Sequence, residues 1–132
     1  MPLPAWDTRQ ISQAALVAAP DGSEVRILCA VAGGSSALFT LAPGGIARAI
    51  VHRTVDEIWF VVAGEGRIWR RRGDSEQITD LMPGVSLTIP VGTEFQFRCD
   101  GATPLGIFGV TLPPWPGEDE ARPVAGKWNP TL

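Results

Sequence analysis

Residues 84–99 read Gly84-Val-Ser-Leu-Thr-Ile-Pro90-Val-Gly92-Thr-Glu-Phe95-Gln-Phe-Arg-Cys99, and this stretch decides the fold class. Two runs rich in β-branched and aromatic residues flank Pro90 and Gly92, and such residues favour strands. Proline ends the first run, and glycine allows the chain to reverse direction. The stretch therefore predicts two short strands joined by a tight turn.

The same pattern extends over most of the chain, where short β-rich runs are separated by Gly, Pro and Asp. The 132 residues include 15 Gly and 12 Pro, scattered singly, which favours many turns. This regular spacing predicts an all-β antiparallel sandwich or barrel. We expect a short helix only at residues 8–13, with Asp7 as its N-cap. The expected strands cover residues 25–31, 37–42, 48–52, 57–63, 67–71, 76–80, 85–89, 94–98 and 105–112.

Composition limits the classes of function. Hydrophobic residues make up 45% of the chain and charged residues 19%, which indicates one globular domain. A net charge of −3 argues against nucleic acid as a partner, and the arginines at 67, 70, 71 and 72 are balanced by nearby acids. One His and two Cys exclude a zinc ribbon.

We also expect a cytoplasmic protein with no membrane association. Residues 1–7 do not resemble a signal peptide, and no apolar run reaches the about 20 residues that a membrane span needs. Cys29 and Cys99 are then expected as buried thiols rather than a disulfide, although the sequence leaves open whether they meet.

The chain is expected to form a single domain, residues 1–132, in three parts. A core barrel covers about residues 25–112, preceded by an N-terminal segment, 1–24. A Pro/Trp-rich C-terminal arm, 113–132, carries five prolines, which cannot run through a central strand. The tryptophans of the arm are expected to pack on the barrel or on a partner.

Two segments resemble the sequence motifs of the cupin superfamily. Gly84, Pro90 and Gly92 have the spacing of the second cupin motif, and Glu57 and Gly64 have the spacing of the first. Phe95 stands where the family has a metal-binding His, and Cys99 where it has Asn. His52 lies off the family's usual positions, and Thr54 occupies the second His position of the first motif. The resemblance implies a double-stranded β-helix, or jelly-roll barrel, and a homodimer.

The family's metal centre uses three His and one Glu, whereas this chain offers His52 and Glu57. We therefore expect no cofactor; a weak or partial divalent metal on these two residues is the alternative, because catalytic zinc typically keeps three protein ligands. Asp56 cannot add a third oxygen, because adjacent strand residues point to opposite faces. Without metal, His52 and Glu57 can form a catalytic acid–base dyad, as in some sugar-modifying cupins.

The other candidate site residues describe a ligand pocket. Arg48 shares strand parity with His52 and offers a cationic end for an anionic ligand. Trp59 shares parity with Glu57 and forms either a stacking wall or plain core. Phe95 and Phe97 share a face and make the pocket apolar. The expected pocket thus comprises Arg48, Thr54, Trp59, Phe95 and Phe97.

Three classes of function follow, and the fold alone does not separate them. The first is a cupin that binds a small-molecule ligand without the three-His metal centre. The second is an enzyme, similar to an isomerase, epimerase or oxygenase, that uses the dyad or a partial metal site. The third is a structural or regulatory subunit, with the barrel serving as a dimerisation scaffold. In a dimer, Trp6, Trp115 and Trp128 are expected to pack against the neighbouring subunit.

Overall fold

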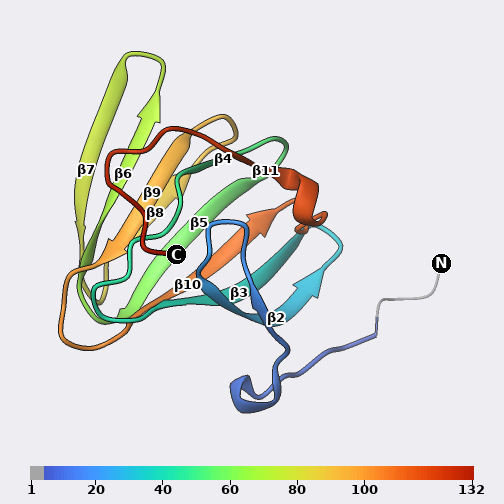
Figure 1. Ribbon diagram of the computed structural model, residues 1–132. Helices are drawn as coiled ribbons and strands as arrows, with labels where there is room; N and C mark the ends of the chain where they lie inside the picture. The colour runs from blue at the N-terminus through green and yellow to red at the C-terminus, as the bar shows by residue number, and fades with distance from the viewer. Residues whose placement is uncertain (1–4) are drawn as a thin grey trace.

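Two antiparallel sheets face each other in the computed structural model, which describes residues 5–132 (Figure 1). The first four residues of the expected N-terminal segment lie outside the described residues. The strands are β1 (Leu16–Ala18), β2 (Glu24–Val31), β3 (Gly34–Leu41), β4 (Ile50–His52), β5 (Asp56–Ala63), β6 (Gly66–Arg72), β7 (Ser75–Leu81), β8 (Ser86–Ile89), β9 (Glu94–Cys99), β10 (Leu105–Leu112) and β11 (Ala121–Pro123). Two 3-10 turns, η1 (Ile11–Gln13) and η2 (Glu118–Glu120), are the helical segments of the described chain.

The strand order is that of a jelly-roll barrel, so the all-β prediction is confirmed. One sheet has the order β1-β2-β3-β10-β5-β8, and the other has the order β11-β4-β9-β6-β7. Within the described residues, no helix is long and apolar enough to cross a membrane.

The core lies between the sheets because the strands alternate. On β5, Glu57, Trp59 and Val61 are buried, whereas the residues between them are exposed. Trp59 lies near the centre of the core, with the ring of Phe97 edge-on at 5.0 Å and that of Phe95 at 5.7 Å. Edge-to-face packing of this kind stabilises aromatic pairs beyond the area that they bury.

The turn at residues 90–92 joins β8 of one sheet to β9 of the other. Gly92 has φ +81°, in the left-handed region that favours glycine, and its N–H donates to the carbonyl of His52 at 3.3 Å. β9 then pairs with β4 so that Phe95 stands opposite Ile50. The stretch that decides the fold therefore also places β9 beside the strand that carries His52.

Two local predictions were wrong. The helix expected at residues 8–13 is only the 3-10 turn η1, and Asp7 makes an ion pair with Arg9 instead of capping it. The strand expected at 48–52 begins only at Ile50. Before it, the N–H of Arg48 donates to the carbonyl of Asp21, so this part of the chain belongs to no ladder. No α-helix forms at residues 8–13, because a single helical turn makes too few hydrogen bonds to offset the conformational entropy lost when a helix nucleates.

The C-terminal arm runs back across the barrel of its own chain (Figure 1). β11 pairs with β4, and the main chain of Trp128 exchanges two hydrogen bonds with the buried Gln96 side chain. The guanidinium groups of Arg67 and Arg98 lie over the Trp128 ring at 5.5 and 5.2 Å. Trp6, by contrast, is 100% exposed and Trp115 36%. Trp128 thus packs on its own chain.

The homodimer therefore remains a prediction, and Trp128 does not provide a reason for it. Static light scattering of the full chain is expected to give twice the chain mass of 14.1 kDa. Trp128→Ala should keep that mass but lower the melting temperature, because Trp128 packs within one chain. A mass of one chain would contradict the dimer. Loss of the dimer in Trp128→Ala would indicate that the arm forms part of the dimer interface.

Candidate functional site

A cavity of about 450 Å³ opens between the sheets, beside the β1–β2 hairpin and the segment that follows β10. Its walls are mostly aliphatic and aromatic, and include Val25, Phe39 and Ile50. Its polar groups come from Asp21, Ser35, Ser36, His52, Glu57 and Thr111. A mostly apolar cavity with a few convergent polar groups is typical of small-molecule sites.

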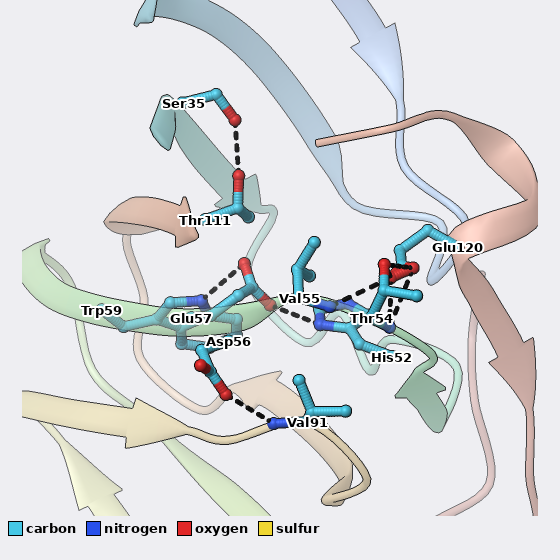
Figure 2. A network of polar contacts seen from close by, with 10 residues as sticks. All are labelled: Ser35, His52, Thr54, Val55, Asp56, Glu57, Trp59, Val91, Thr111 and Glu120. Carbon is cyan, nitrogen blue, oxygen red and sulfur yellow. Dashed lines mark hydrogen bonds and ion pairs between the residues drawn. The ribbon is translucent and has the colours of Figure 1, made fainter. Parts of the chain in front are cut away.

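His52 and Glu57 form an acid–base pair on the cavity wall (Figure 2). His52 Nδ1 lies 3.2 Å from Glu57 Oε2, although the alignment is too poor for a hydrogen bond, and the two side chains are 4% and 3% exposed. The indole N–H of Trp59 donates to Glu57 Oε1 at 3.3 Å. Asp56 points to the other side of β5 and accepts a hydrogen bond from the Val91 N–H. The alternation expected for Asp56 and Glu57 is therefore present.

Burial controls the protonation of both groups. Loss of water raises the pKa of Glu57 to about 8, opposed by the Trp59 hydrogen bond and reinforced by Asp21. Burial lowers the pKa of His52 to about 4, although the negative charge of Glu120 opposes this. Near pH 7 the pair therefore consists of a neutral carboxylic acid and a neutral imidazole.

Aromatic rings hold the imidazole in place. The rings of Phe95 and Trp115 meet that of His52 edge-on, with centroids 5.2 and 5.3 Å away. Phe95 comes from β9 and Trp115 from the arm, so His52 lies between two elements far apart in sequence. The main-chain N–H of Trp115 donates to Ser35 Oγ at 2.9 Å, and Ser35 in turn contacts Thr111. The arm is thus tied to β3 and β10 at the cavity.

The buried carboxylate of Glu120 holds the turn between β4 and β5, which brings His52 and Glu57 together. Glu120 accepts hydrogen bonds from the N–H and hydroxyl of Thr54, and from the N–H of Val55 at 3.1 Å (Figure 2). These groups lie in the turn between β4 and β5. A carboxylate that accepts several main-chain N–H groups fixes such a turn, because charge-assisted hydrogen bonds are strong.

The cavity contains four of the seven residues expected from the sequence. His52, Glu57, Trp59 and Phe95 line it together. Arg48 does not: it is exposed, and its Nε donates to the Leu132 carbonyl, because the irregular chain before β4 breaks the expected parity. Thr54 is exposed in the turn and binds Glu120. Phe97 lies in the core against Trp59.

Asp21 is the main site residue that the sequence analysis missed. It is 5% exposed, lines the cavity, and accepts hydrogen bonds at Oδ1 from the N–H and hydroxyl of Ser23, at 2.9 and 2.6 Å. Burial raises its pKa. The pair Asp21-Gly22 is typical of a turn, and nothing in that pattern indicates that the turn folds against the barrel opening.

These features define a class: a small jelly-roll barrel with an acid–base pair on the wall of an apolar cavity. The model of the family described as "Cupin domain" matches residues 37–111, and the chain belongs to this family. No curated protein matches the sequence.

Several solved structures share the fold at low sequence identity. A variant of Streptomyces PAC13 with uridine has a TM-score of 0.72 at 13% identity, covering 92% of each chain; Pac13 is described as a nucleoside dehydratase. BH2720 from Bacillus halodurans has a TM-score of 0.64 at 21% identity, covering 71% of this chain and 73% of its own. Oxalate decarboxylase from Bacillus subtilis has a TM-score of 0.70 at 17% identity, over 80% of this chain and 29% of its own.

The residues around the cavity do not fit a three-His metal centre. In the described part of the chain, no group of three or more His, Cys, Asp or Glu side chains is placed to hold a metal ion. The Phe95 ring fills the space beside His52 with an apolar edge. His52 and Glu57 remain as the two donors that could share an ion with water.

Metal content tests this fit. Dialysed protein should carry well under one equivalent of Fe, Mn, Zn or Ni by elemental analysis. Phe95→His would add a third donor, so we expect more retained zinc, at a cost of about 1–3 kcal/mol for a polar group in an apolar site. Phe60→His, on the outer face of β5, is the matched control and should retain no extra zinc. Stoichiometric metal in the unaltered chain would contradict the prediction.

Proposed function

We propose that this protein binds a small organic molecule in the barrel cavity. The observation that carries the proposal is the cavity itself, about 450 Å³ in volume, with three buried titratable groups, Asp21, His52 and Glu57, on a mostly apolar wall. Ligand sites usually measure about 300–1,000 Å³ and use few polar groups to orient the ligand. Desolvation of His52 and Glu57 lowers stability, and a ligand that bonds to them would recover part of that loss.

A thermal-shift panel of sugars, nucleosides, phenols and amines tests ligand binding. A compound that binds only the folded state raises the melting temperature. Ala37→Leu would fill the cavity, because Ala37 lines it, and should abolish the shift. Ala42→Leu is the matched control, since Ala42 is exposed just beyond β3, and should keep it. If no compound stabilises the protein, or if both variants respond alike, the cavity is not the binding site. That outcome would favour the hypothesis that the protein is a dimeric scaffold.

Proton transfer on the bound ligand is a second candidate function, and one observation favours it. Near neutral pH, Glu57 holds a proton that it can donate, while the neutral imidazole of His52 can accept one. A dehydratase needs such an acid and base, and Pac13, described as a nucleoside dehydratase, has this fold.

A single substitution separates binding from catalysis. In Glu57→Gln the amide keeps the shape of the side chain but cannot supply the proton, so turnover of a converted ligand should fall by about 10²–10⁴-fold. Binding, followed by the thermal shift, should remain. Unchanged turnover would show that Glu57 takes no part in the reaction. A ligand that is bound but never converted would show that the protein binds the ligand without catalysing a reaction.

A further inference from the structure

We propose that the cavity selects a positively charged organic ligand, an amine or ammonium compound with a flat hydrocarbon body. This inference rests on the proposed ligand-binding function and assigns the ligand's charge. It also reverses the sequence-based expectation of an anionic ligand, which depended on Arg48.

The ionisable groups of the cavity are mainly acidic. Asp21 and Glu57 both line it, whereas no Lys or Arg does so among the described residues. Arg48 attracts Asp21 electrostatically, but its side chain is exposed and bonded to the carboxyl-terminal residue. The basic group on the wall, His52, is held neutral by burial near pH 7. An anion in this cavity would face two carboxyl groups and no permanent cation.

The two carboxyl groups also influence each other's ionisation. Burial, with a smaller contribution from the charge of Asp21, raises the pKa of Glu57, so Glu57 is neutral near pH 7 and Asp21 is the carboxyl group that would pair with a cation. Ser23 donates both of its hydrogen bonds to Asp21 Oδ1. His52 Nδ1, buried beside Glu57, has no well-aligned partner in the described chain. An ammonium group beside Asp21 would favour the carboxylate form of Asp21 and pair with it, and the ligand's own polar atoms could satisfy His52.

Aromatic rings line the same space. Phe39, Trp59, Phe95 and Trp115 all contribute to the cavity wall. The face of an aromatic ring attracts a cation, most strongly for tryptophan and in sites removed from water. The rings also provide apolar area for the body of the ligand. Acid and aromatic groups together therefore favour a cation over a neutral molecule of equal shape.

Three probes that differ mainly in charge test the inference: tryptamine, tryptophol and indole-3-acetate, which are cationic, neutral and anionic at pH 7. Calorimetry measures their affinities, and the ring signals of His52, the single histidine in the chain, report where they bind. Tryptamine should bind tightest, with indole-3-acetate at least about tenfold weaker, or about 1.4 kcal/mol.

Charge-removing variants connect the preference to the cavity. Asp21→Asn should reduce the preference for tryptamine over tryptophol. Asp56→Asn, which removes a carboxylate from the outer side of β5, is the matched control and should leave the preference unchanged. An equal loss in Asp56→Asn would mean that only the overall charge matters, and would overturn the inference.

The outcomes also separate this inference from the proposed function. Tryptophol or indole-3-acetate binding as tightly as tryptamine would overturn the charge preference while supporting ligand binding in the cavity. Binding of none of the three would overturn the preference for ring-bearing amines, and the thermal-shift panel would then decide on ligand binding independently.

Discussion

The burial of Glu57 is the constraint on which the site depends. A carboxyl group placed among apolar side chains loses its hydration, so it must remain protonated or find compensating partners. The barrel provides the Trp59 N–H and the imidazole of His52, both within 3.3 Å of a carboxyl oxygen. Burial of His52 in turn disfavours the imidazolium. The pair is consequently neutral near pH 7.

Distant segments maintain this arrangement. Glu120 fixes the turn between β4 and β5, and Trp115 covers one side of the imidazole. Asp21, from the hairpin before β2, adds a second carboxyl group to the cavity. Both the arm and the N-terminal hairpin are therefore part of the site, although neither belongs to the region matched by the family model. The chemistry of the cavity depends on these additions to the shared barrel.

The sequence predicted the parts of the site that depend on strand alternation and motif spacing. Alternation on β5 placed Glu57 and Trp59 inward and Asp56 outward, and motif spacing drew attention to Phe95, which does line the cavity. The prediction that Arg48 faces the same side as His52 was wrong. It assumed a strand over residues 48–52, whereas β4 begins only at Ile50. Contacts across long loops have no local pattern, so the roles of Asp21 and Glu120 could be found only from the folded chain. For Trp115 the sequence predicted packing on the barrel or on a partner, but not its place beside His52.

The most direct measurement is the NMR titration of the single histidine of the chain, His52. His52 is buried as a neutral imidazole beside a protonated Glu57. Its ring signals should therefore remain those of neutral imidazole as the pH falls from 7 to 5, with a midpoint near 4, the value to which burial lowers its pKa. A midpoint at or above the ordinary value of about 6.5 would show a solvated or positively charged imidazole, and would contradict the account.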